Sequence, residues 1–199
     1  MSPQNRDLWN FLGFILLAAW FGLLNGWQPL ALLAAACAVH EGGHLLALRW
    51  FGARPMAFHL SPLGAEMTVD PIGLSYGREL IAILAGPGAN ILCGTILALL
   101  PLPGERSWPA AGAHFVLAAF NLLPMRPLDG GRALETLGSW IGGGAVGERA
   151  CGAVGAATAA AVTVFLFWLM WASGGNLWLL PVLLSTAEYG KAELLAANP

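Results

Sequence analysis

Charged residues are scarce in this sequence. Only 10% of its 199 residues are Asp, Glu, Lys or Arg, and 57% are hydrophobic, whereas a soluble globular domain usually carries about 25% charged residues. The net charge of −2 and the lack of a basic run exclude nucleic acid as an expected partner. The composition indicates an integral membrane protein that lies in a lipid bilayer. Because each transmembrane helix needs about 20 apolar residues, the chain has room for about five or six such helices and no separate soluble domain.

Cysteine is also scarce. The three cysteines, Cys37, Cys93 and Cys151, lie far apart within apolar stretches. Without paired spacing they indicate neither a disulfide framework nor a zinc site built from thiolates. We interpret them as small packing residues.

Apolar runs predict the fold class. The runs cover residues 8–24, 30–51, 80–100, 110–123, 150–172 and 177–187. The first is longer than the 7–15 apolar residues usual in a signal peptide, and the last is short for a full span. We predict an all-α polytopic membrane protein with about six transmembrane helices, in a single integral-membrane domain over residues 1–199.

Basic residues give the orientation, because Lys and Arg concentrate on the cytoplasmic side of membrane proteins. If the N-terminus is cytoplasmic, Arg106 is the one basic residue of nine that falls outside. We therefore expect a multi-pass protein with both termini in the cytoplasm. Between the second and third spans, the pieces MAFHL and AEMTV, joined by SPLG, read as two strands. They predict a small membrane-associated β-hairpin.

The second span contains the motif HEGGH. His40 and His44 lie one helical turn apart on one face, about 6 Å along the axis, so both imidazoles can bind one zinc ion. Glu41 lies beside them, as the general base does in the HExxH arrangement of metalloproteases. The alternative is that these groups are satisfied within a helix interface. A carboxylate near mid-membrane costs about 2.5 kcal/mol or more, which favours a functional role.

A catalytic zinc usually has a third protein ligand. The candidates are Asp129, Asp70, Glu66, His59 and His114. Asp129 is favoured because the turn MRPLDGGR brings it back to the cytoplasmic end of the bundle, where the histidines are expected to open. Two imidazoles and a carboxylate suit one Zn2+ ion best among common metals.

Two further polar positions interrupt the spans. Asn121 in the fourth span is explained either by a hydrogen bond between helices or by donation to the oxyanion or the substrate backbone. In the third span, Gly86, Pro87, Gly88 and Asn90 indicate close helix packing with a kink.

The motifs HEGGH, LAGPGAN and FNLLPMRPLDGG, in this order, resemble those of the site-2 protease family of intramembrane zinc metalloproteases. The likeness is to the compact bacterial branch that includes the stage IV sporulation protease, and covers roughly residues 35–135. It implies a three-helix catalytic core at about 29–135, with zinc held by His40, His44 and Asp129. It also implies that Glu41 is the general base and that Asn121 helps to hold the substrate.

The resemblance further implies a bacterial cell membrane and a substrate with a single transmembrane span, cut within or beside that span. One glycine often found in the family's hairpin is Ala65 here, and the extra regulatory domain of many relatives is not expected.

Two other functions fit parts of the pattern. A membrane metal-ion transporter could use the same His and carboxylate groups, but transporters commonly contain repeats, and HEGGH does not recur in the second half. A non-catalytic membrane chaperone could bind helices in the same groove, but binding alone has no need of Glu41.

Overall fold

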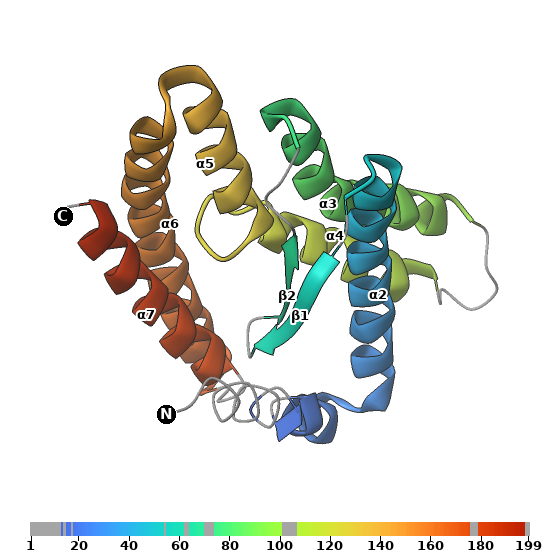
Figure 1. Cartoon of the computed structure of the whole chain (residues 1–199). Coiled ribbons are helices and arrows are strands. Elements are labelled where there is room, and N and C mark those ends of the chain that lie inside the picture. Colours follow the sequence, from blue (N-terminus) through green and yellow to red (C-terminus); the bar gives the residue numbers. More distant parts are fainter. Residues whose placement is uncertain are drawn as a thin grey trace. The chain divides into compact units, whose positions relative to one another are not determined.

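The computed structural model describes residues 13, 15–16, 18–53, 55–61, 64–69, 74–100, 107–175 and 179–197, with the backbone alone for 55–61, 64–69, 192 and 194–197. The elements with assigned bounds are α2 (Trp27–Trp50), β1 (Pro55–Ser61), β2 (Gly64–Val69), α3 (Tyr76–Leu99), α4 (Ser107–Asn121), α5 (Asp129–Gly142), α6 (Gly144–Ala172) and α7 (Leu180–Ala197) (Figure 1). They form two compact units, which divide after Asn121. The single domain over residues 1–199 stays a prediction.

In the first unit, α2 packs against α3 and α4, and α3 packs against α4. A glycine lets the backbones of α2 and α3 approach one another closely. A Cβ atom at Gly43 of α2 would overlap the carbonyl of Ala85 in α3 and lie 2.9 Å from the Cβ of Ala89. The backbones of α2 and α3 therefore meet at the HEGGH motif, which brings the side chains of α3 within reach of its histidines.

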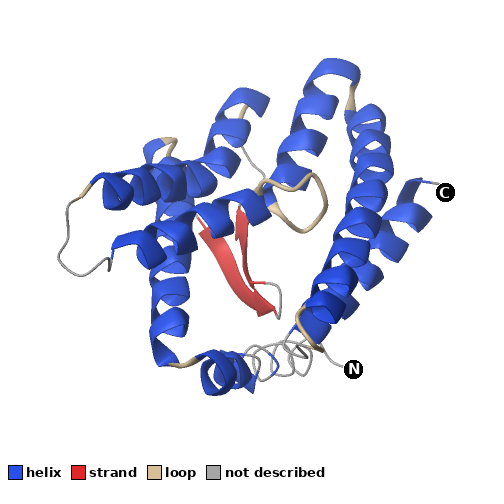
Figure 2. Cartoon of the chain, turned by 180° about the vertical axis from the view of Figure 1, so that it is seen from behind, coloured by secondary structure: helices blue, strands red, loops and turns tan. Residues whose placement is uncertain are grey.

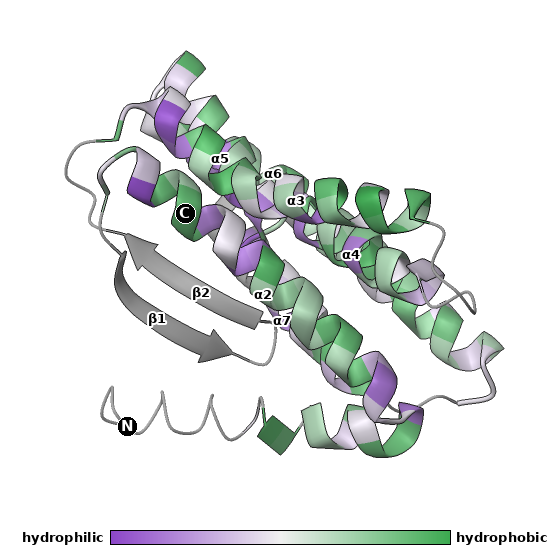
Figure 3. Cartoon of the chain, turned by 90° about the vertical axis from the view of Figure 1, so that its right-hand side faces the viewer, coloured by the Kyte–Doolittle hydropathy of each residue, from purple (hydrophilic) through white to green (hydrophobic). Residues whose placement is uncertain are grey.

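Three helices, α2, α3 and α6, are long and apolar enough to cross a membrane. Hydrophobic residues dominate along them (Figure 3), and many large apolar side chains lie on the surface, such as Leu46 and Trp50 of α2. Exposed apolar area on this scale suits a lipid environment. The described part of the chain is predominantly helical, as predicted, and the count of six transmembrane helices stays a prediction because α4 has only 15 residues.

The strands β1 and β2 lie side by side (Figure 2) and pair antiparallel. Their register places Phe58 opposite Met67 and Ser61 opposite Gly64. They include both segments that the sequence predicts as strands. The centre of the expected SPLG turn, residues 62–63, lies outside the described residues. Association of this pair with the membrane stays a prediction.

In the second unit, α6 packs against α5 and α7 through small residues. The buried residues of α6 are Gly147, Cys151, Gly152, Gly155 and Ala159. The apolar runs assigned no helix to residues 124–149, so α5 was missed. Its large apolar residues recur every three or four positions with polar or small residues between them. This amphipathic 14-residue helix therefore contains no continuous apolar run.

Candidate metal centre

His40 and His44 point toward one another from the same face of α2. Their ring centroids are 4.7 Å apart and their planes are nearly perpendicular, at 84°. The Nε2 atom of His40 lies 3.2 Å from the Nε2 atom of His44. Because the two residues are four apart in a regular helix, this convergence follows from the helical period.

The spacing of these nitrogens fits a shared metal ion. Zinc bonds imidazole nitrogen at about 2.0–2.1 Å in tetrahedral geometry, which places two such nitrogens roughly 3.3 Å apart. The 3.2 Å between the Nε2 atoms of His40 and His44 matches that value. The pair can therefore supply two ligands to one ion without moving.

The ring of His44 is oriented by α3. Its Nδ1 lies 2.8 Å from the carbonyl oxygen of Ala82. Because a carbonyl can only accept, Nδ1 carries the proton, and the neutral ring keeps its lone pair on Nε2. Histidine ligands of metals are commonly oriented by a hydrogen bond of this kind from the second ring nitrogen.

Gly86 makes room for the same ring. A Cβ atom at Gly86 would overlap Nε2 of His44 and lie 2.6 Å from Cε1 and 2.7 Å from Cδ2. We interpreted Gly86 from the sequence as a packing and kinking residue, and its contact with a candidate ligand was missed. The signal is the spacing of four between Ala82 and Gly86, which puts both on one face of α3, but only the register of α2 against α3 shows what that face meets.

The ring of His40 is held by a side chain. Its Nδ1 lies 3.3 Å from Nδ2 of Asn90, which is completely buried in α3. The amide oxygen of Asn90 lies 2.9 Å from Nδ1 of His114 in α4, and Nε2 of His114 lies 3.5 Å from Sγ of Cys93. His114, one of the alternative third ligands, therefore hydrogen-bonds to the partner of His40, and Cys93 does more than fill space.

The predicted catalytic residues Glu41 and Asn121 lie in the first unit as well. Glu41 follows His40 in α2 and is partly exposed. Asn121 ends α4, and its Nδ2 donates to the carbonyl of Leu117 at 3.0 Å. That local bond holds the amide at the helix end, and the two predicted roles of Asn121, a hydrogen bond between helices or a contact with substrate, stay predictions.

Asp129 is the first residue of α5 and is buried, with 7% of its surface exposed. The preceding turn is tight: Cβ atoms at Gly130 and Gly131 would overlap the backbone of Leu122 and Met125. The two glycines after Asp129 thus allow this turn to close.

An ion pair between the half-buried Arg126 and the buried Glu193 fixes the turn to α7. The backbone N–H and the Nε–H of Arg126 both donate to Oε1 of Glu193, each at 3.1 Å. Burial by itself lowers the pKa of Arg126, but the hydrogen bond to Glu193 and the charge of neighbouring carboxylates such as Glu135 raise that pKa above its ordinary value. Arg126 therefore stays charged at any working pH.

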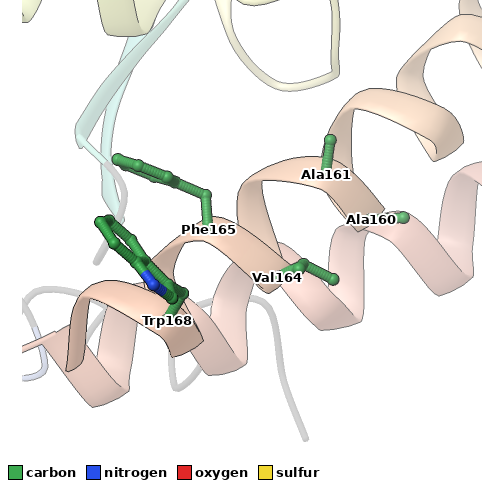
Figure 4. Close-up of a pocket in the computed structure, with 5 residues that line it drawn as sticks. All are labelled: Ala160, Ala161, Val164, Phe165 and Trp168. Carbon is green, nitrogen blue, oxygen red and sulfur yellow. The ribbon is translucent and has the colours of Figure 1, made fainter. Parts of the chain in front are cut away.

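The side chains of the remaining candidates for the third metal ligand lie outside the described residues. Asp70 lies outside the described residues, as do the side chains of His59 and Glu66, although the backbones of these two pair with one another across β1 and β2. A separate pocket on α6 is lined by Ala160, Ala161, Val164, Phe165 and Trp168 (Figure 4). None of its lining residues offers a metal ligand or an acid–base group.

Two curated proteins match part of the chain. No family model matches the sequence. The chain is 25% identical over 138 residues to a zinc metalloprotease of Methanocaldococcus jannaschii, covering 64% of this chain and 40% of that protein. It is 28% identical over 113 residues to a candidate zinc metalloprotease of Synechocystis, covering 53% of this chain and 30% of that protein. The match thus spans less than half the length of either relative.

The fold also has a counterpart among solved structures. The site-2 protease from Methanocaldococcus jannaschii superposes with a TM-score of 0.65, covering 92% of this chain and 88% of that chain, at 23% sequence identity. The helical arrangement around the HEGGH motif is therefore one that a site-2 protease also has.

Proposed function

We propose that this chain, which its similarity to zinc metalloproteases and to a site-2 protease assigns to the site-2 protease family, is an intramembrane zinc endopeptidase. It hydrolyses a peptide bond within or next to the transmembrane segment of a membrane protein with a single span. One observation carries the proposal: two Nε2 atoms lie 3.2 Å apart in a helix apolar enough to cross a membrane. Hydrophobic spanning helices carry such groups at a free-energy cost and for a function.

The proposed zinc ligands are His40, His44 and Asp129. In support, His40 and His44 converge on one face of α2, and Asp129 is a buried carboxylate at the first position of α5. Two imidazoles and a carboxylate leave a fourth position open in a tetrahedral site, as catalytic zinc requires.

The reaction follows from the side chains of α2 and α4. Zinc, when bound, polarises the scissile carbonyl and makes an attacking water more acidic. Glu41 takes the proton of that water and delivers it to the leaving nitrogen. Asn121, at the end of α4, donates to the substrate backbone or to the developing oxyanion.

Access requires that the substrate helix first unwind, because helical carbonyls are tied into backbone hydrogen bonds. An opened strand can add to the edge of the β1–β2 pair by main-chain hydrogen bonding. The protein has about six spans, both termini on the cytoplasmic side of a bacterial cell membrane, and a site that opens toward the cytoplasm.

The test uses Glu41→Gln. Purified protein in detergent is incubated with a panel of single-span substrates, with and without a chelator, and its zinc content is measured in parallel. Glu41→Gln should abolish cleavage and keep one zinc per chain, while Glu148→Gln, which alters an exposed carboxylate on α6, should leave cleavage unchanged. Full cleavage by Glu41→Gln rules out the mechanism, and His40-dependent zinc flux into proteoliposomes without cleavage indicates the transporter instead.

A further inference from the structure

A chain of buried hydrogen bonds runs from the candidate metal site into the helix bundle. It joins His40 of α2 to Asn90 of α3, Asn90 to His114 of α4, and His114 to Cys93 of α3, with distances of 3.3, 2.9 and 3.5 Å. Asn90 has no exposed surface and His114 only 5%. Every donor along such a buried chain must face an acceptor, so the position of one proton constrains all the others.

The hydrogen atoms can be arranged along this chain in two consistent ways. In the first, Nδ2 of Asn90 donates to Nδ1 of His40, so the proton of His40 is on Nε2. The amide oxygen of Asn90 then accepts from Nδ1–H of His114, and the thiol of Cys93 donates to Nε2 of His114. In this arrangement His40 points an N–H at the lone pair of His44.

In the second arrangement every bond is reversed. The amide of Asn90 is rotated by half a turn, its oxygen accepts from Nδ1–H of His40, and its nitrogen donates to Nδ1 of His114. The Nε2–H of His114 then donates to the sulfur of Cys93. Each imidazole stays neutral in both arrangements, since its one proton changes nitrogen and no group changes its net charge.

Metal binding distinguishes the two arrangements. A histidine that binds a metal through Nε2 needs its lone pair on that atom and its proton on Nδ1, and this is the state of His40 in the second arrangement alone. His44 is always in the matching state, because its Nδ1 faces the carbonyl of Ala82. The choice between the arrangements therefore rests with His40 and with the side chain that faces its Nδ1, which is Asn90.

We propose that Asn90 is a positioning residue that couples metal binding at His40 to the proton position on His114, by rotation of its buried amide. This inference rests on the proposed role of His40 as a zinc ligand. It assigns a function to Asn90, His114 and Cys93 that simple helix packing does not require, because packing alone would leave the His114 proton indifferent to the metal.

The first experiment observes the protons in the wild-type protein. The sequence contains four histidines, so the 15N spectrum of histidine-labelled protein in bicelles can be assigned by single His→Gln variants. Adding zinc to chelator-treated protein should move the His114 proton from Nδ1 to Nε2, together with the shift of His40. An unchanged His114 tautomer while His40 binds zinc overturns the coupling.

The second experiment measures zinc affinity by competition with a chromophoric chelator. Asn90→Leu should weaken zinc binding about 10- to 100-fold, as loss of a partner of a metal-bound histidine commonly does. Asn90→Asp should bind at least as tightly as wild type, because a carboxylate accepts from Nδ1–H of His40 without having to rotate. Thr95→Val is the control, since the exposed Thr95 hydroxyl on the same helix bonds, within the described part of the chain, to the carbonyl of Ile91.

The outcomes separate this inference from the proposed function. Wild-type affinity in Asn90→Leu, in a protein that binds zinc and cleaves its substrates, overturns the role of Asn90 and leaves the protease intact. A wild-type protein that binds no zinc overturns both. Recovery of affinity in Asn90→Asp but not in Asn90→Leu supports the positioning role over a general loss of packing.

Discussion

Replacing Gly86 with alanine should remove zinc binding while α3 stays folded. The new methyl carbon would overlap Nε2 of His44 and lie 2.6 Å from Cε1, whereas an ordinary van der Waals contact begins at 3.4 Å. Relief of the Cε1 contact alone requires the ring to move by about 0.8 Å, and the closer Nε2 atom must move further. Metal–ligand distances hold to within about 0.2 Å, so this displacement is too large for the zinc–nitrogen bond. A displaced ring also loses the geometry of its 2.8 Å contact with the carbonyl of Ala82.

The expected loss of zinc affinity is about 100-fold or more, since the change displaces a ligand and also disturbs its hydrogen-bond partner. The assay is a zinc competition titration, with circular dichroism to follow helix content. Gly88→Ala is a close control, because a Cβ atom at Gly88 meets nothing within 4 Å and alanine is the better helix former. Wild-type affinity in Gly86→Ala would falsify the packing of His44 against α3.

Three more predictions follow from named contacts. Gly43→Ala should lower the thermal midpoint because its methyl group would press into α3, whereas Gly42→Ala, which faces open space, should leave that midpoint unchanged or raised. Glu193→Ala should lower the free energy of unfolding by about 2 kcal/mol in a denaturant titration, since it removes two charge-assisted hydrogen bonds from Arg126, which keeps Glu135 at 3.7 Å; Arg126→Met combined with Glu193→Leu should recover much of the loss. Asn121→Ala should reduce the cleavage rate by about 100- to 1,000-fold with unchanged zinc affinity, and an equal loss of both would point to a structural role.

The helices of the first unit were largely predictable because the ends of an apolar run lie close to the ends of the helix that it forms. The run at 30–51 corresponds to α2 at Trp27–Trp50, and the run at 80–100 to α3 at Tyr76–Leu99. The helix α5 was missed because its apolar residues face one side only, and such a pattern has no long run. Amphipathic helices at the edge of a membrane are found by periodicity, and the search for runs passes over them.

The candidate site was also predictable only in part. The convergence of His40 and His44 is internal to one helix, so the period of 3.6 residues predicts it from spacing alone. The contacts of Gly86 and Asn90 depend on which face of α3 meets α2, and these residues lie more than 40 positions after the histidines they touch. The spacing of residues within α3 does not determine which face of α3 meets α2. The roles of Asn121 and Asp129 came from family resemblance and from the expected topology, and they stay predictions.

The hydrogen-bond partners of His40 and His44 differ in how easily a substitution can remove them. The partner of His44 is the carbonyl of Ala82, which belongs to the main chain and persists with any small residue at that position. The partner of His40 is a single side chain, Asn90, which one nucleotide change can remove. A lineage that loses the proposed activity should therefore lose Asn90 early and keep the geometry of His44 long afterwards.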